Sequence, residues 1–248
     1  MLKILIPMGG EAKQFSESGY TFPKPLLEIA GRSMIEVVVE NIRPAEPCQF
    51  VFVCNRAHLE RYALGDVLRL IAPGSIVVSM RAPTAGALCS VLLAAEHLGR
   101  DEELMVANGD QYVRASMDDF LARARGENAD GCIMTFPSAH PKWSYAKVDG
   151  KGDVVAVAEK RPISRDATVG IYYFRRAGDF LDGAHRMIKK RVTLQGQYYV
   201  CPVFNELILA HKLIITYPIE RDQMFSLGTP EDYENFTRSG AAALLNRK

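Results

Sequence analysis

The chain has 248 residues, with 30 basic and 29 acidic side chains and a formal net charge of +1. This balance excludes a general nucleic-acid or membrane-surface binder, although a local cationic cleft is compatible with it. The five cysteines form no Cys-x-x-Cys pair, which argues against a disulfide framework or a structural zinc site. No apolar run approaches the roughly 18 residues that span a bilayer, and the N-terminal one meets Pro7 too early for a secretory signal. We therefore expect a soluble, cytoplasmic protein.

The first predicted strand, Lys3–Pro7, leads into Gly9-Gly10 and then into Pro23-Lys24-Pro25. The apolar run is typical of a central parallel strand, and the glycine pair allows the backbone to approach an anion closely. The two prolines restrict the backbone on both sides of Lys24. By itself the proline-lysine-proline segment reads as a surface turn, but its position after the strand favours a polyphosphate site.

Apolar strand-like runs then alternate with amphipathic helical patterns through the first half of the chain. This alternation predicts an α/β fold with a mostly parallel sheet covered on both faces, and ligands at the carboxyl ends of its strands. Serines with capping-box spacing support two of the helix starts. The predicted strands are Gln49–Asn55, Ser75–Met80, Leu104–Asn108 and Gly131–Thr135, and the predicted helices are Ser33–Asn41, His58–Leu70, Ala87–Leu98 and Ser116–Ala124.

The sequence pattern changes after Phe136. In Ser144–Glu159, two stretches of alternating apolar and polar residues are separated by a turn, as in a β-hairpin. A strand at Thr168–Phe174, helices near Gly178–Lys190 and Val203–Lys212, and a strand at Leu213–Pro218 follow. Thr229-Pro230 opens a last helix, with Thr229 as N-cap and Asp232 at its third position. We divide the chain into one domain at 1–238, with a first half at 1–136 and a second half at 137–238, and a fraying tail at 239–248.

Several motifs, weak singly but specific in their order, resemble those of the sugar-1-phosphate nucleotidylyltransferases, also called nucleoside-diphosphate-sugar pyrophosphorylases. The resemblance runs along most of the chain and implies a single-domain GT-A-like, Rossmann-like fold with a β-hairpin on the acceptor side. It implies that residues 1–136 form the nucleotide-binding half and residues 137–238 the acceptor-binding half. Its carriers are Gly9-Gly10, Phe22-Pro23-Lys24-Pro25-Leu26, Thr84-Ala85-Gly86-Ala87, Asn108-Gly109-Asp110, Glu159-Lys160, Val169-Gly170-Ile171-Tyr172 and Gly228-Thr229-Pro230-Glu231-Asp232.

The resemblance implies that the phosphate of a sugar 1-phosphate attacks the α-phosphorus of a nucleoside triphosphate, and that pyrophosphate leaves. Positioning and charge neutralisation then supply the catalysis, with no enzyme nucleophile. The implied catalytic residues are Lys24, on the triphosphate, and Asp110, as the ligand of a Mg²⁺ cofactor. The implied nucleotide-binding residues are Met8, Gly9, Gly10, Lys13, Lys24, Thr84, Gly86, Asn108 and Gly109.

On the acceptor side, Lys160 resembles the lysine that binds the sugar phosphate, Glu159 the acceptor of sugar hydroxyl groups, and Gly170 a glycine in close contact with the ligand. From the pattern alone, Glu159-Lys160 is as readily an ordinary hairpin end. Trp143 and Tyr145 precede the hairpin, where an aromatic ring suits a sugar or a choline-like group, although core packing is the commoner role.

Two positions depart from the family pattern. Gln14 stands where an arginine of the family commonly binds the triphosphate. The glutamine amide has neither the positive charge of a guanidinium group nor its two parallel hydrogen-bond donors. Lys13, one position away, is the nearest cation available to replace the missing arginine charge. Ser226 stands where many relatives carry a second metal-binding aspartate, which leaves Asp222 as a weak substitute.

The motifs and the resemblance together predict a Mg²⁺-dependent nucleotidylyltransferase, and the resemblance alone implies that it makes an activated sugar for surface polysaccharide assembly. Its partners are a nucleoside triphosphate and a sugar 1-phosphate, and homo-oligomerisation stays open. Two alternatives remain: a catalytically weak nucleotide-binding homologue, and a cytidylyltransferase acting on a small non-sugar phosphate. A nicotinamide-dependent oxidoreductase is disfavoured, because the Gly-x-Gly-x-x-Gly spacing is absent.

Overall fold

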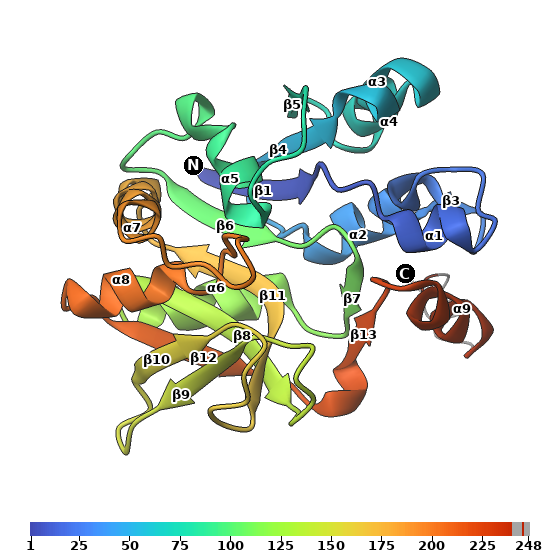
Figure 1. Ribbon diagram of the computed structural model, residues 1–248. Helices are drawn as coiled ribbons and strands as arrows, with labels where there is room; N and C mark the ends of the chain where they lie inside the picture. The colour runs from blue at the N-terminus through green and yellow to red at the C-terminus, as the bar shows by residue number, and fades with distance from the viewer. Residues whose placement is uncertain (240–244, 246–248) are drawn as a thin grey trace.

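The computed structural model describes residues 1–239 and Leu245, and Figure 1 shows its single α/β domain. The predicted tail therefore lies outside the described residues except for Ser239 and Leu245. No helix in the described part of the chain combines the length and apolar character needed to cross a membrane. All five cysteines are free thiols.

A nine-stranded mixed sheet forms the centre of the molecule. Strand β1 lies between β4 and β6 and pairs with both in parallel, which confirms the predicted central strand. The parallel half continues from β4 to β5. The second half of the sheet contains β8, β9, β10, β11 and β12, and β11 connects it to the parallel half by pairing antiparallel with β6. The strands are β1 (Leu2–Met8), β4 (Cys48–Asn55), β5 (Ile76–Met80), β6 (Glu103–Ala107), β8 (Gly131–Pro137), β9 (Tyr145–Val148), β10 (Val154–Ala158), β11 (Asp166–Phe174) and β12 (Ile214–Pro218).

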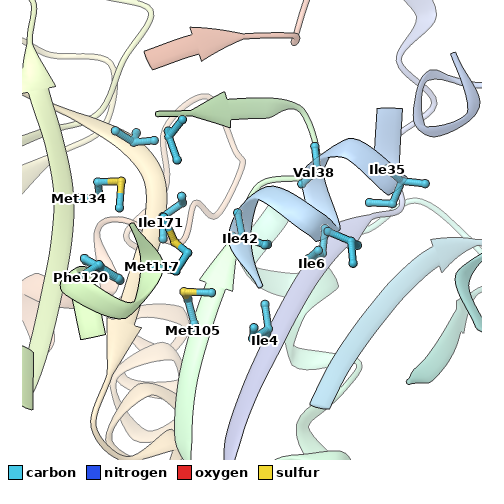
Figure 2. Close-up of a cluster of buried hydrophobic side chains, with 14 of the residues drawn as sticks. Ile4, Ile6, Ile35, Val38, Ile42, Met105, Met117, Phe120, Met134 and Ile171 are labelled. Carbon is cyan, nitrogen blue, oxygen red and sulfur yellow. The ribbon is translucent and has the colours of Figure 1, made fainter. Parts of the chain in front are cut away.

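Helices cover both faces of this sheet, and each face has its own hydrophobic cluster. Alternate residues of β1 point to opposite faces: Ile4 and Ile6 belong to one cluster and Leu5 to the other. Figure 2 shows the first cluster, where Ile35, Val38 and Ile42 of α2 meet the β1 residues. Helices α2 (Met34–Ile42), α4 (Leu64–Ile71), α6 (Met117–Gly126) and α9 (Pro230–Arg238) contribute to this face, and α5 (Ala87–Leu92), α7 (Ala177–Lys189) and α8 (Val203–Leu209) to the other.

Local signals in the sequence account for most helix boundaries. The hydroxyl groups of Ser33, Ser116 and Thr229 accept hydrogen bonds from backbone amides three residues later, at 3.3, 3.1 and 3.1 Å, as predicted. The helix predicted over His58–Leu70 is instead two, α3 (Arg56–Tyr62) and α4, because Ala63 adopts a left-handed φ of 50° between them. The helix predicted over Ala87–Leu98 is α5 followed by a short 3-10 turn at Ala95–His97.

Two small ladders that the sequence did not predict fix the loops around the sheet. Strand β7 (Gln111–Val113) pairs with β13 (Met224–Ser226), and β2 (Glu28–Ile29) pairs with β3 (Arg32–Ser33). Figure 1 shows β13 and α9 returning to the side of the molecule that holds α1 (Lys13–Glu17). The β7–β13 ladder therefore carries the C-terminal segment to the end of β6.

Candidate active site

A cleft of about 640 Å³ opens at the carboxyl ends of β1 and β6. It is bounded on one side by the residues after these strands, and on the other by the β9–β10 hairpin and β11. This is the edge at which open α/β sheets bind ligands. Of the residues predicted as a site, the cleft lining includes Met8, Gly10, Lys24, Asn108, Gly109, Asp110, Glu159, Lys160 and Gly170.

The shortest ionic contact in the cleft joins Lys24 and Asp110, with Nζ 2.6 Å from Oδ2. Lys24 starts a 3-10 turn, Lys24–Leu26, that is held by a 2.8 Å hydrogen bond from the Leu26 amide to the Pro23 carbonyl. Asp110 follows β6, and its carbonyl accepts a 2.8 Å hydrogen bond from the Leu227 amide. The two side chains are 20% and 29% exposed, so solvent and a ligand can reach the pair.

Gly170 lies where β11 changes its register against β8. Its carbonyl accepts hydrogen bonds from the Asn108 amide at 3.0 Å and from Nε2 of Gln111 at 3.3 Å. The residue has a left-handed φ of 94°, and an added Cβ would lie 2.8 Å from the Gln111 side chain and closer still to that of Asn108. The close contact of this glycine is therefore with the protein's own residues at the cleft wall.

Half-buried Glu159 and buried Ser144 form the polar wall opposite the strand ends. Ser144 donates a 2.5 Å hydrogen bond to Oε2 of Glu159. Burial raises the pKa of the Glu159 carboxyl, and the Ser144 bond and the Lys160 charge oppose this only in part. Lys160 itself has a left-handed φ of 51°. Its Nζ donates a hydrogen bond to the Tyr199 hydroxyl at 3.1 Å.

Behind this wall, the phenol of Tyr172 and the thiol of Cys201 are buried yet still line the cleft. Burial raises the pKa of both groups far above their usual ranges, so both are neutral at pH 7. Tyr172 shares a 2.9 Å hydrogen bond with Thr168. This side of the cleft thus presents neutral hydroxyl and thiol groups beside the Glu159 carboxyl group and the Lys160 ammonium group.

Five residues predicted for the site do not line the cleft in the described structure. Lys13 is 75% exposed and pairs with Glu11 at 3.6 Å. Gly9 packs on the Met80 side chain, and Gly86, with φ 115°, packs on the backbone of Tyr198. The remaining two are Thr84, whose hydroxyl bonds to Ser90 and to the Gly86 carbonyl, and Tyr145, which is fully buried and donates to the His140 carbonyl at 2.7 Å.

The two departures from the family pattern both lie in the cleft. Gln14 lines it without a charge, and Ser226 donates a 2.8 Å hydrogen bond to Oδ2 of Asp232. Asp222, the weak substitute for a second metal carboxylate, is 78% exposed and pairs with Arg114 outside the lining. The carboxylate that the structure places beside Ser226 is Asp232.

Sequence reasoning missed Lys142, Asp232 and Tyr199 as cleft residues. The sequence places Asp232 in a motif of the resemblance and predicts the third helical position for it, which it occupies, but predicts no ligand contact. Lys142 and Tyr199 carry no local signal, because the folding of distant segments brings them to the cleft. Trp143, for which core packing was the commoner expectation, is only partly buried and lines the cleft while packing edge-on against Phe136 at 5.2 Å.

The Mg²⁺ ion that the resemblance implies would need a hard oxygen ligand, and the cleft offers the Asp110 carboxylate. Among the described residues no group of three or more His, Cys, Asp or Glu side chains forms a metal cage. Mg²⁺ does not need one, since it usually takes one or two carboxylates and completes its shell with water and substrate phosphates. The half-exposed Asp110 carboxylate at the strand end supplies such a hard oxygen ligand.

Comparisons with known proteins agree with this geometry. A family model described as nucleotidyl transferase matches residues 3–192. No curated protein matches the chain. Among solved structures, the nucleoside-diphosphate-sugar pyrophosphorylase of Vibrio cholerae RC9 is 25% identical, with a TM-score of 0.82 over 95% of this chain and 99% of that one.

Two further solved structures share the fold at lower identity. A Bacillus anthracis protein described as a candidate glucose-1-phosphate thymidylyltransferase, in complex with sucrose, has a TM-score of 0.75 and 17% identity over 100% of this chain and 96% of that one. The UTP-bound UGPase of Acinetobacter baumannii has a TM-score of 0.71 and 18% identity over 96% and 92% of the two chains.

Proposed function

The chain belongs to the nucleotidyl transferase family, and on that premise we propose that it transfers a nucleoside monophosphate from a nucleoside triphosphate to a sugar 1-phosphate. In this reaction an oxygen of the sugar phosphate forms a bond to the α-phosphorus. The bond from that phosphorus to the oxygen bridging to the β-phosphate breaks, and pyrophosphate leaves with the electron pair. We propose that the protein works in the cytoplasm and that its product is an activated sugar for surface polysaccharide assembly.

The Lys24–Asp110 pair is the observation that carries this proposal. It lies at the carboxyl edge of the parallel strands, and both members are accessible from the cleft. Lys24 would hold a triphosphate oxygen near the α-phosphorus and neutralise charge that develops there. Asp110 would hold the Mg²⁺ ion, which when bound neutralises phosphate charge.

The opposite wall supports an acceptor with hydroxyl groups and a phosphate. The Glu159 carboxyl is already fixed by Ser144, so it is oriented before a ligand binds. Lys160 Nζ, which donates to Tyr199, would orient the acceptor phosphate for in-line attack. Uridine, thymidine, cytidine and guanosine triphosphates all stay as candidate donors.

The test is pyrophosphate release from a matrix of these four triphosphates against sugar 1-phosphates and small phosphate acceptors, in the presence of Mg²⁺. Asp110→Ala serves as the blank. A signal for one pair that disappears in the variant supports the transferase and identifies both substrates. Signal from phosphocholine but from no sugar phosphate would instead support the cytidylyltransferase alternative.

Gln14 favours one second candidate, a nucleotide-binding homologue with little turnover. This side chain lines the cleft but adds no positive charge where relatives commonly have an arginine. Calorimetry separates the two functions, because a degenerate binder would bind a triphosphate tightly and release no pyrophosphate with any acceptor.

A further inference from the structure

Lys142 is a cation of the cleft that the proposed reaction has not yet used. In the described part of the chain the cationic side chains that line the cleft are those of Lys24, Lys142 and Lys160, and the acidic ones are Asp110, Glu159 and Asp232. Lys24 and Lys160 have proposed phosphate partners. Lys142 lies on the segment before β9, next to Trp143.

Two contacts hold the Lys142 ammonium group. Its Nζ lies 3.6 Å from Oδ1 of Asp232, and 4.7 Å from the centre of the Trp143 ring. The Lys142 side chain is 44% exposed, so water screens its ion pair with Asp232. A weak pair of this kind exchanges readily for a more strongly charged partner.

The Lys142–Asp232 pair is connected to the Lys24–Asp110 pair. Ser226 donates to Oδ2 of Asp232 at 2.8 Å and accepts from the Gly228 amide at 3.3 Å. Gly228 also faces Asp110, because an added Cβ would lie 3.4 Å from Oδ2 of that carboxylate. Gly228 and Ser226 therefore lie between the two lysine–aspartate pairs.

The positive charge near the first loop is lower than the family pattern leads one to expect. Gln14 is neutral, and Lys13 points into solvent beside Glu11. A triphosphate with one Mg²⁺ still carries a net negative charge, which Lys24 alone does not balance. Lys142 is the remaining described cation of the cleft without a proposed substrate contact.

We propose that Lys142 binds a phosphate oxygen of a substrate, and that it leaves Asp232 when the substrate enters the cleft. Asp232 is then a counter-ion that neutralises the ammonium group in the empty cleft and competes with the substrate phosphate for it. The proposal rests on the proposed function for the identity of the substrates. A phosphate oxygen has two sources in this cleft, the triphosphate and the acceptor phosphate.

The chain provides its own reporter for this exchange. Trp143 is the single tryptophan of the sequence, and the ammonium group lies over its ring. Movement of Lys142 from the ring to a phosphate changes the surroundings of the indole. We therefore expect tryptophan emission to change in a saturable way as a phosphate ligand is added, and to change much less in Lys142→Met.

The experiment measures binding of two probes, tripolyphosphate with Mg²⁺ and glucose 1-phosphate, by calorimetry and by Trp143 emission. In Lys142→Met we expect Kd to rise about tenfold or more for at least one probe, since a charge-assisted hydrogen bond is lost. Lys142→Gln should behave alike. Lys151→Met, at the exposed tip of the β9–β10 hairpin, is the matched control and should bind both probes as the wild type does.

The outcomes separate the two sources and the competing assignments. Weakening confined to tripolyphosphate assigns Lys142 to the triphosphate, and weakening confined to glucose 1-phosphate assigns it to the acceptor. Unchanged Kd for both probes in folded Lys142→Met and Lys142→Gln overturns the proposal. Because the probes need no turnover, a silent pyrophosphate assay together with Lys142-dependent binding would reject the proposed reaction and leave this site standing.

The Asp232→Asn variant tests the same proposal independently, because the expected change in affinity is in the opposite direction. Removing the competing carboxylate should strengthen binding of the affected probe by a few-fold, since Lys142 no longer has to leave an ion pair. Weaker binding in Asp232→Asn, with unchanged binding in Lys142→Met, would make Asp232 the ligand-binding residue and would contradict the assignment of Lys142.

Discussion

The two sides of the cleft handle polar groups in different ways. On the side of the strand ends, Lys24 and Asp110 form an ion pair that is partly exposed and lies on loops. On the hairpin side, Glu159 and Ser144 form a short hydrogen bond against a buried layer that includes Tyr172. The first pair consists of two charges that can exchange partners, and the second is a carboxyl group whose orientation is already fixed by a hydrogen bond.

This difference fits two separate tasks. Exposed pairs contribute little to stability and are easily replaced by phosphate oxygens or a metal ion. A buried, hydrogen-bonded carboxyl group keeps its orientation and distinguishes ligands by where their hydroxyl groups lie. Substitutions on the first side should therefore change turnover, and substitutions on the second side should change acceptor binding and stability.

The largest effect is expected from Asp110→Asn and Lys24→Ala. Each should lower kcat by roughly 10²–10³-fold, because each removes a group that neutralises charge at the reacting phosphates. Pyrophosphate release with a working substrate pair measures this. Asp66→Asn, a 77% exposed carboxylate on α4, is the control. Wild-type turnover in both site variants would contradict the assignment of this pair.

Gly86→Ala tests the close packing of the loop before α5 on Tyr198. An added Cβ would lie 2.7 Å from the Tyr198 nitrogen and closer to its carbonyl oxygen, and φ is 115°. The Tyr198 amide donates to the Ala85 carbonyl at 2.7 Å, so the substitution pushes apart two bonded segments. We expect a loss of about 2–3 kcal/mol in the free energy of unfolding.

Urea denaturation measures this loss, and Gly126→Ala provides the control. Gly126 is the last residue of α6, and an added Cβ there meets nothing within 4 Å. That substitution should leave stability unchanged or raise it by up to about 1 kcal/mol. Equal stability of the two variants would show that the contact with Tyr198 is not a tight one in solution.

Lys160→Ala should change binding of the acceptor more than that of the nucleotide. Loss of the ammonium group should raise KM for the acceptor about tenfold and leave KM for the triphosphate near its wild-type value. Steady-state kinetics with one substrate varied at a time separates the two. Tyr199→Phe removes only the hydroxyl that Lys160 contacts, so it should show a smaller effect in the same direction.

The smallest effect is expected from Glu159→Gln. Because the carboxyl pKa is raised in the folded protein, the folded state binds more protons than the unfolded one, and its stability falls as pH rises above the usual value of 4.5. Glutamine does not titrate. The Tm of the variant relative to wild type should therefore rise between pH 4 and pH 7, and a constant difference would contradict the raised pKa.

The sequence predicted the parallel half of the fold well because its strands are continuous apolar runs between helices with clear caps. Strand β1 and the end of β6 bring Met8, Asn108 and Asp110 to one edge of the sheet as predicted. The sequence did not predict the break at Ala63, since alanine is a good helix former and rarely adopts the left-handed φ that it has here.

Residues of the cleft that come from distant loops were the hardest to predict. Strands β7 and β13 are short and polar in part, and only their pairing brings Ser226 and Asp232 near Asp110. The resemblance implies ligand contacts for Gly86 and Tyr145, and these stay predictions, while the packing of Gly86 on Tyr198 and of Tyr145 in the core could not be predicted from the sequence.

The docking of the C-terminal segment links the cleft to the order of protein synthesis. Tyr20 donates a 3.2 Å hydrogen bond to Glu234 across 214 residues of sequence, and Tyr233 donates to the Glu28 carbonyl. Contacts so distant in the chain form late, after the earlier elements have been made. A nascent chain that already contains Lys24 and Asp110 therefore has an incomplete cleft until α9, which carries Tyr233 and Glu234, has left the ribosome.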